Sequence, residues 1–295
     1  MKKIIVIVGP TGVGKTKLSI MLAKKYDGEI INADSMQIYK HLDIGTAKVT
    51  ESEKEGIRHY LLDYKDVVED YSIYDYQIDC RKIIKKIQNR GKTVIIVGGT
   101  GLYIKSALYD YKLDKVNNAA NYDSFDTELL YNRLLEIDKK SALKIGPNNR
   151  VRIINALNYY DNNSKSIVDN KTDKLLYDVC FIGLETNRDC LYSIINERVD
   201  IMINNGLVDE VKSFYDKGIF SKPLLNGIGY KELYQYFRGD ISLDDAINCI
   251  KKNSRHYAKR QFTFFKNQMP VKWFNVDYNN FNNTYVDVIN YIDNF

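Results

Sequence analysis

The sequence is poor in the residues that build disulfides and metal sites, and it contains no long apolar run. Its 295 residues include four cysteines and three histidines, and no two cysteines form a C-x-x-C pair. This spacing argues against a zinc site and favours reduced thiols, as in cytosolic proteins. No stretch approaches the ~20 apolar residues of a membrane-spanning helix. We expect no signal peptide, because the apolar run at 4–8 leads straight into a glycine loop. The sequence therefore predicts a cytoplasmic protein without membrane contact.

Neither sign of charge dominates. The formal net charge is +5, from 43 Lys and Arg against 38 Asp and Glu. This mild excess permits a nucleic acid or another polyanionic partner without requiring one. The apolar content of 44% is normal for a globular protein, and the length allows one or two domains.

Short β-branched runs alternate with helical patterns over the first 110 residues. We predict strands at Lys3–Val8, Glu29–Asn32 and Thr93–Val97, with helices at Lys15–Tyr26 and 72–90. This alternation indicates a parallel sheet with helices on both faces. Functional residues of such sheets lie beyond the carboxyl ends of the strands. We therefore expect the loops at 9–16, 33–37 and 98–103 to share one edge.

Residues 112–174 interrupt this pattern, because they contain no strong strand. We predict a loop at 117–126, helices within 127–138 and 149–160, and overall a small helical insertion domain. The rest of the chain, 1–111 and 175–295, is predicted to form the α/β core. Its later elements are a returning strand at 177–185, helices near 188–204, 206–217, 230–237 and 243–266, and a last strand within 271–277. The predicted fold class is α/β, with a P-loop parallel sheet flanked by helices.

The segment GPTGVGKT matches the phosphate-loop pattern G-x-x-x-x-G-K-[ST] in full, between a predicted strand and a predicted helix. Its backbone N–H groups and the start of the helix attract an anion. Lys15 adds a positive charge, and the Thr16 hydroxyl is placed to ligate Mg²⁺. The residues expected to hold the phosphate are Gly9, Pro10, Thr11, Gly12, Val13, Gly14, Lys15 and Thr16. The pattern indicates a phosphate group without naming the molecule that carries it.

An acidic residue is missing where ordinary NTPases place one, at the end of a neighbouring apolar strand to hold Mg²⁺ or its water. The predicted strand at 93–97 ends in Gly98-Gly99-Thr100. The acid at this edge is Asp34, which can hold Mg²⁺ through water, accept a proton, or only cap the following turn. Thr100 can donate to an anionic oxygen or cap the next helix. These alternatives stay open from spacing alone.

Six segments together resemble the bacterial tRNA dimethylallyltransferases, also called tRNA isopentenyltransferases. They are GPTGVGKT (9–16), INADSMQIYKHLDIGTAK (31–48), VGGTGLY (97–103), ERVDIMINNGLVDEVKSF (197–214), NGIGYKEL (226–233) and AKRQFTFFK (258–266). The resemblance implies transfer of the dimethylallyl group of dimethylallyl diphosphate to N6 of the adenine at position 37, next to the tRNA anticodon. It also implies that the phosphate loop holds the diphosphate, with Mg²⁺ as cofactor.

The resemblance further implies roles for single residues. Asp34 would be the general base. Lys15, Thr16 with Mg²⁺, and Thr100 would stabilise and orient the diphosphate. Lys212 would add a further cation, unless it belongs to a solvated helix face. Contacts with the tRNA anticodon stem-loop would come from Asp34, Ser35, Met36, Gln37, Arg152, Tyr230, Lys231, Lys259, Arg260 and Gln261.

The predicted helix near 243–266 supports an RNA partner independently, because basic and aromatic residues alternate in it. Its basic residues are Lys251, Lys252, Arg255, His256, Lys259, Arg260 and Lys266, and its aromatic residues include Tyr257, Phe262 and Phe265. Basic side chains bind phosphates, and aromatic rings stack on bases. The alternative is a solvated face whose aromatic side lies in the core.

Two departures concern the insertion. The family usually carries R-x-x-R-A-L-E where this chain keeps Arg152 but has Asn155 and Asn158, and residues 117–126 are short where an arginine-bearing helix is usual. Both affect the expected strength of tRNA binding more than the chemistry. Three other functions remain: an adenylate isopentenyltransferase, which needs no tRNA clamp, a P-loop small-molecule kinase, which consumes ATP, and a binding module without catalysis. We expect a monomer.

Overall fold

The computed structural model describes residues 3–114, 120–122, 124–170 and 174–295. The chain separates into two compact units, Met1–Leu108 with Tyr177–Phe295, and Tyr109–Leu176. The loop predicted at 117–126 lies partly outside the described residues. Among those that are described, no helix is both long and apolar enough to cross a membrane.

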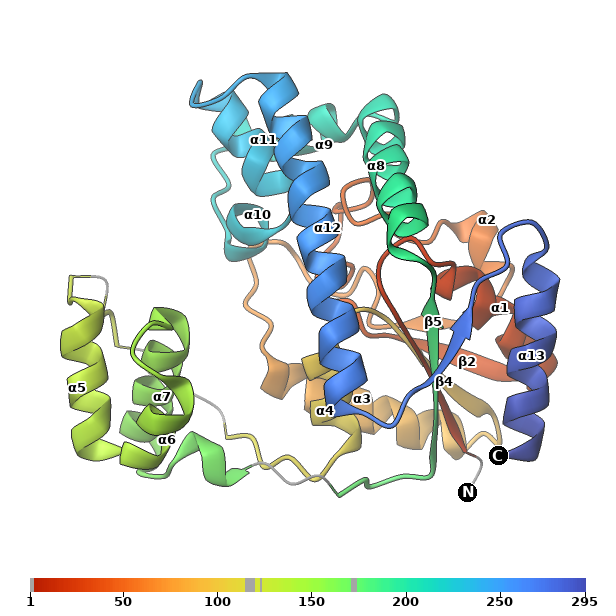
Figure 1. The fold of residues 1–295 in the computed structure, drawn as a ribbon, viewed down its shortest axis with the longest axis horizontal. Coiled ribbons are helices and arrows are strands. Elements are labelled where there is room, and N and C mark those ends of the chain that lie inside the picture. Colours follow the sequence, from red (N-terminus) through yellow and green to blue (C-terminus); the bar gives the residue numbers. More distant parts are fainter. Residues whose placement is uncertain (1–2, 115–119, 123, 171–173) are drawn as a thin grey trace. The chain divides into compact units, whose positions relative to one another are not determined.

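The larger unit is built on a six-stranded parallel sheet of order β3-β2-β4-β1-β5-β6 (Figure 1). The strands are β1 (Ile4–Val8), β2 (Gly28–Asn32), β3 (His59–Tyr60), β4 (Thr93–Val97), β5 (Val179–Glu185) and β6 (Lys272–Asn275). The predicted α/β fold with a parallel sheet is confirmed. Because β4 pairs with both β1 and β2, the loops after these three strands meet at one edge of the sheet.

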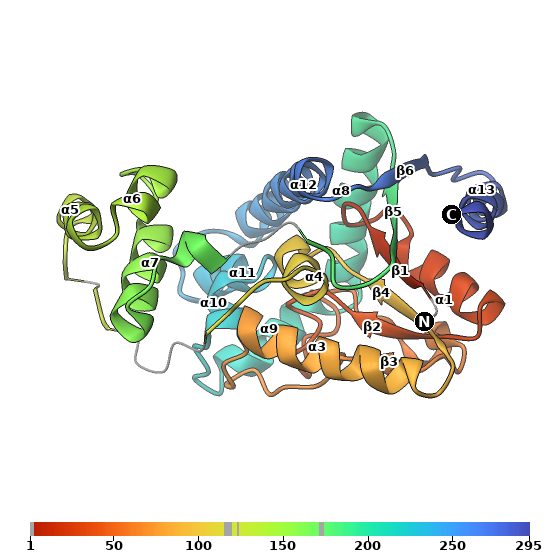
Figure 2. The same ribbon diagram turned by 90° about the horizontal axis from the view of Figure 1, so that it is seen from below.

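Helices cover both faces of the sheet (Figure 2). On one face, α1 (Lys15–Lys25) and α13 (Phe281–Asn294) pack over a cluster that contains Ile7, Ile95 and Ile182. On the other, α3 (Ile73–Gln88) and α4 (Gly101–Leu108) pack together, and α3 contacts β2 and β4. The short helix α2 (Glu51–Lys54) precedes β3. The buried strands therefore form a rigid base for the edge where their loops meet.

Five further helices of the same unit form a second core: α8 (Arg188–Asn204), α9 (Leu207–Tyr215), α10 (Lys222–Asn226), α11 (Tyr230–Phe237) and α12 (Leu243–Gln268). Figure 1 shows them grouped beyond β5, with the long helix α12 running back toward the sheet. Tyr39 and Leu42, from the segment after β2, belong to this core as well. The segment that follows β2 is thus held between the sheet and the helical group.

The smaller unit contains α5 (Thr127–Ile137), α6 (Lys139–Ile145), α7 (Arg150–Asn163) and a 3₁₀ turn at Ile167–Asn170. Its core includes Leu130, Leu134 and Leu157. Helix α6 was not predicted, because Asp138 separates it from α5 by a single residue and caps it, accepting the Ser141 N–H at 3.1 Å. Asn158, one of the two family departures, is buried and accepts the Ala120 N–H at 2.8 Å.

Candidate active site

The phosphate loop connects β1 to α1 and has the backbone that its glycines permit. Gly9, Gly12 and Gly14 have φ values of 140°, 89° and 85°, a region that residues with a side chain rarely adopt. The Lys15 ammonium donates to the Pro10 carbonyl at 2.6 Å, and Thr16 lies exposed in the first turn of α1. The predicted phosphate loop thus lies at the sheet edge, and the Lys15 ammonium contacts the backbone of the same loop.

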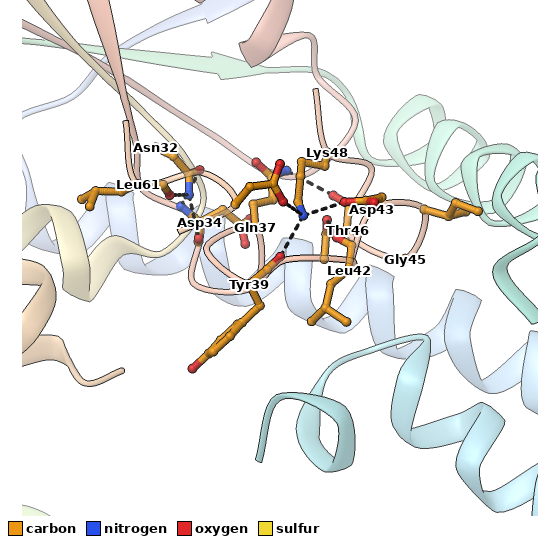
Figure 3. Close-up of polar contacts among 12 residues, drawn as sticks. Asn32, Asp34, Gln37, Tyr39, Leu42, Asp43, Gly45, Thr46, Lys48 and Leu61 are labelled. Atoms are coloured by element: carbon orange, nitrogen blue, oxygen red, sulfur yellow. Dashed lines mark hydrogen bonds and ion pairs between the residues drawn. The ribbon is translucent and has the colours of Figure 1, made fainter. Parts of the chain in front are cut away.

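Asp34 lies two residues beyond Asn32, the last residue of β2, and its backbone is fixed by the side chain of Asn32 (Figure 3). The Asn32 amide accepts the Asp34 N–H at 3.1 Å and donates to the Asp34 carbonyl at 3.0 Å and the Leu61 carbonyl at 2.8 Å. One Asp34 carboxylate oxygen accepts the Met36 N–H at 2.9 Å. A carboxylate has about four lone-pair sites, so Asp34 caps this turn and keeps capacity to take a proton.

Thr100 is tied to the Asp34 segment through both its backbone and its side chain. Its N–H donates to the Ala33 carbonyl at 3.0 Å, and its hydroxyl oxygen accepts the Ser35 N–H at 3.0 Å. The same hydroxyl lies 3.2 Å from the Ser35 hydroxyl. The structure therefore brings Asp34 and Thr100 together, as the sequence predicted for loops of neighbouring parallel strands.

Arg198, on α8, adds a second cation to this edge. The pKa of Lys15 is lowered to about 7, mainly by desolvation and in addition by the charge of Arg198, while the charge of Asp34 opposes both. Desolvation likewise lowers the pKa of Arg198, again against the attraction of Asp34. The charges of Lys15, Arg198 and Asp34 thus act on one another at this edge. The site thus contains two cations and one carboxylate where an anionic substrate is expected.

Helix α12 contributes two residues to the same edge. The Tyr257 hydroxyl hydrogen-bonds with Thr100 and Gln261, and burial raises the pKa of Tyr257. Gln261 is 4% exposed, and its amide bonds to the backbone of Thr11 and of Gly99. The sequence predicted a tRNA contact for Gln261. In the structure this side chain is buried against the two loops of the site.

Three further predicted site residues have partners within the chain: Tyr230 and Lys231, predicted to contact RNA, and Lys212, predicted to add a cation for the diphosphate. Tyr230 is fully buried, and its hydroxyl donates to Glu210 at 2.6 Å, so it is part of the helical core. Lys212 donates to both carboxylate oxygens of Asp216 at 2.8 and 2.7 Å on an exposed stretch of α9. This contact agrees with the alternative given for Lys212 in the sequence analysis, a solvated helix face. Lys231 lies 3.6 Å from Glu232 and is partly exposed.

The remaining predicted RNA-binding residues are accessible. Ser35, Met36 and Gln37 are partly exposed, and the Gln37 amide donates to the Thr46 carbonyl at 3.1 Å. Arg152 is exposed on α7 of the smaller unit. One exposed face of α12 is mainly basic and consists of Lys252, His256, Lys259, Arg260, Thr263 and Lys266. We call this set the basic face of α12.

Sequence reasoning missed Arg198, Tyr257 and Glu210 as parts of this site. Arg198 stands in the segment 197–214 quoted for the resemblance, and Tyr257 stands in the predicted basic helix near 243–266. Periodicity alone did not show that either residue faces the sheet edge. Glu210 accepts the N–H groups of Asp43, Ile44 and Gly45 at 3.0, 2.7 and 3.1 Å. It thereby fixes the segment after β2 to α9, a long-range contact that leaves no local pattern.

The same segment is fixed from its other side by Lys48, whose side chain is 4% exposed (Figure 3). Its ammonium donates to the Tyr39 carbonyl at 2.8 Å, to Asp43 at 2.7 Å and to Asp63 at 2.5 Å. A buried cation is stable only with such partners. Within the described ranges no group of three or more His, Cys, Asp and Glu side chains forms a metal cluster.

A phosphate loop at the edge of a parallel sheet, with its own lysine, a second cation on α8 and an acid in the loop after β2, defines a P-loop protein for a phosphate-bearing substrate. Family comparison narrows this class, since the IPP transferase family model matches residues 37–268. The chain belongs to this family, the tRNA dimethylallyltransferases, as the sequence predicted.

Relatives and solved structures agree along nearly the whole chain. The tRNA dimethylallyltransferase of Anoxybacillus flavithermus is 48% identical over 99% of this chain and 96% of its own length. The tRNA isopentenylpyrophosphate transferase structure from Staphylococcus epidermidis has a TM-score of 0.76 and 42% identity, and covers 100% of both chains. A eukaryotic dimethylallyltransferase described as acting on tRNA has a TM-score of 0.80 at 32% identity, and covers 92% of this chain and 74% of its own.

Proposed function

We propose that the protein transfers the dimethylallyl group of dimethylallyl diphosphate to N6 of adenine 37 in tRNA, releasing diphosphate. The single observation that carries the proposal is the arrangement of charge at the sheet edge. Lys15 and Arg198 lie beside the phosphate loop, and Asp34 lies close to both. The strand β4 beside the loop ends in glycines and Thr100, where an NTPase would carry its acid. This arrangement fits a leaving diphosphate and a proton acceptor.

The cations stabilise the leaving group. As the bond between the prenyl carbon and the diphosphate oxygen breaks, negative charge grows on the diphosphate. Loop N–H groups, Lys15 and Arg198 would stabilise that charge, and donors held in place before the reaction are an effective form of electrostatic catalysis. Desolvation, which lowers the pKa of Lys15 to about 7, strengthens its attraction to an anion that replaces the missing water.

Asp34 takes the proton. An exocyclic adenine amine is a poor nucleophile, because its lone pair is delocalised into the ring. As its nitrogen bonds to the prenyl carbon, the amine must lose a proton, and a fixed carboxylate within reach accepts it. Asn32 and the Met36 N–H hold Asp34 in place, and Thr100 is held beside it through Ser35.

The site fits Mg²⁺, which prefers oxygen ligands and few protein contacts. Thr16 would offer a hydroxyl beside the loop, and the diphosphate would offer further oxygens. When bound, Mg²⁺ would neutralise charge on the diphosphate. The residues of the chain would supply the binding and the proton transfer described above.

The RNA contacts belong to the segment Ser35–Gln37, to the basic face of α12 and to the smaller unit through Arg152. Anticodon loops are single-stranded, so an adenine can leave its stack at low cost and enter a pocket for chemistry. Ser35–Gln37 directly follows Asp34, so a base placed there has its amine near the proposed base.

The test is a prenylation assay with an anticodon stem-loop, dimethylallyl diphosphate and Mg²⁺, in which mass spectrometry locates the modified base. We expect one added C₅H₈ group on the adenine next to the anticodon. A stem-loop with inosine at that position is the matched control, because it lacks the exocyclic amine. Modification of AMP but not of the stem-loop would contradict the proposal and identify an adenylate isopentenyltransferase.

We also propose that the enzyme is monomeric and cytoplasmic. Its four cysteines are free, and two of them, Cys80 and Cys180, are buried, which suits a reducing compartment. Light scattering during size-exclusion chromatography tests the first part, and a dimer mass would contradict it. Fractionation of cells with an antibody against the protein tests the second.

A further inference from the structure

Gln261 joins the two loops that form the proposed diphosphate site. Its side-chain oxygen accepts the Thr11 N–H at 3.2 Å, and its side-chain nitrogen donates to the Gly99 carbonyl at 3.1 Å. Thr11 belongs to the phosphate loop after β1, and Gly99 belongs to the loop after the neighbouring strand β4. One buried amide therefore bridges the ends of two adjacent strands.

Helix α12 packs directly on the second of these loops. A Cβ atom added at Gly99 would lie 1.9 Å from the Gln261 side-chain nitrogen, and one added at Gly101 would lie 2.2 Å from the ring of Phe264. These distances leave no room for a side chain. The glycines on both sides of Thr100 therefore allow α12 to reach the loop, and Tyr257, one turn earlier, hydrogen-bonds with Thr100 itself.

We propose that Gln261 is a positioning residue for diphosphate binding, which holds the phosphate loop and the Thr100 loop in one geometry. The proposal rests on the proposed function, because it takes the diphosphate as the ligand of that loop. An amide suits the role, since it donates and accepts at once and brings no negative charge near the anion. Gln261 would act through Thr11 and Gly99 without touching the reacting atoms.

The first test measures the affinity for inorganic diphosphate with Mg²⁺ by calorimetry, without tRNA. Gln261→Met keeps the length of the side chain but removes both hydrogen bonds, and we expect diphosphate affinity to fall about 5- to 50-fold. The matched control is Gln235→Met on the exposed part of α11, which should leave affinity unchanged. Stem-loop affinity should change by less than about 2-fold in both variants, because Gln261 is buried away from the RNA face.

The Gln261→Glu variant allows a second test, the pH dependence of diphosphate affinity, which a substitution at a merely structural residue would not change. When protonated, the carboxylic acid offers a donor and an acceptor as the amide does; when ionised, it loses the donor and repels the diphosphate. Relative to wild type at each pH, diphosphate affinity of this variant should rise toward the wild-type value as pH falls. The Gln261→Met variant should show no such recovery.

Gly99→Ala tests the contact from its other side. The new methyl group would displace the Gln261 amide, so the single variant should weaken diphosphate binding. The double variant Gly99→Ala with Gln261→Ala should bind no more weakly than Gln261→Ala alone, because both changes remove the same bridge.

The outcomes separate this proposal from the function on which it rests. A wild-type protein that binds no diphosphate would contradict the proposed function, and the role of Gln261 with it. A wild-type protein that binds diphosphate, with unchanged affinity in Gln261→Met and a pH-independent ratio in Gln261→Glu, would overturn the role of Gln261 alone. Reduced stem-loop affinity with normal diphosphate affinity would also overturn it, because Gln261 would then act on the RNA.

Discussion

At the scale of single residues, the account depends most on Asp34. Its backbone is held by two hydrogen bonds to the Asn32 side chain, which remain when the Asp34 side chain is replaced, so the surrounding loop should stay folded although the bond from the Met36 N–H is lost. We predict that Asp34→Ala slows prenyl transfer by about 10²- to 10⁴-fold, because the amine loses its proton acceptor. Single-turnover kinetics measure this rate. Stem-loop affinity should stay near the wild-type value.

Asp244→Asn is the matched control for this prediction, because Asp244 is exposed in the first turn of α12. It should react at the wild-type rate. Undiminished turnover in Asp34→Ala would rule Asp34 out as the base, whatever its position.

Lys15 predicts a pH dependence of diphosphate binding. Its pKa is about 7 in the free protein, mainly because of desolvation, and a bound anion raises this pKa. Binding above pH 7 therefore takes up a proton, and affinity should fall by about tenfold per pH unit as pH rises above 7. Calorimetry in buffers of different ionisation enthalpy measures the proton uptake. The Lys15→Met variant should bind diphosphate more weakly and take up fewer protons on binding. Equal proton uptake by this variant and the wild-type protein would contradict the assignment of the uptake to Lys15.

At the scale of elements, α12 presents two different faces. Its buried face places Tyr257 and Gln261 on the site, and its basic face is exposed. We predict that Lys259→Ala with Arg260→Ala weakens stem-loop binding and makes its dependence on salt shallower by about two counterions, since two phosphate contacts are lost. Filter binding over a salt series measures the slope.

The control for this pair is Lys85→Ala with Lys86→Ala, which removes the same charge from the exposed part of α3. It should leave the salt slope unchanged. The same slope in both double variants would show that α12 does not contact the RNA.

The segment after β2 gives a prediction for stability. Glu210 accepts three backbone N–H groups and the Tyr230 hydroxyl. Glu210→Ala removes all four bonds and leaves the buried Tyr230 hydroxyl without the acceptor for its proton, so we predict a loss of about 2–4 kcal/mol in the free energy of unfolding. Urea denaturation measures it. Asp209→Ala, at the exposed neighbour, should change stability by less than about 0.5 kcal/mol.

At the scale of the whole molecule, the elements that local patterns specify were predictable. β4 was predicted with its observed bounds, and β1 and β2 were predicted to within one residue at one end. The capping box of Ser72 and Asp75 marks the start of α3 in the sequence itself. Asp34 and Thr100 were also predicted to lie at one edge, because each follows the carboxyl end of a parallel strand. The rule that such ends share an edge depends on topology alone.

The remainder depends on contacts between distant segments. β3 has two residues and exists because it pairs with β2, and the C-terminal helix α13, absent from the sequence-based prediction, packs beside α1. Gln261 and Tyr230 stand in segments that the resemblance assigned to RNA, yet both are buried. A motif shows which residues belong to a site, whereas packing decides whether a side chain faces the solvent or the core.

The most direct measurement of the central claim follows all reactants in one mixture of enzyme, stem-loop, dimethylallyl diphosphate, Mg²⁺ and ATP. The account predicts one diphosphate released for each adenine that gains a dimethylallyl group, while the amount of ATP stays constant. Loss of ATP with the appearance of ADP, or a phosphorylated product without prenylated adenine, would contradict it and identify the phosphate loop as that of a kinase.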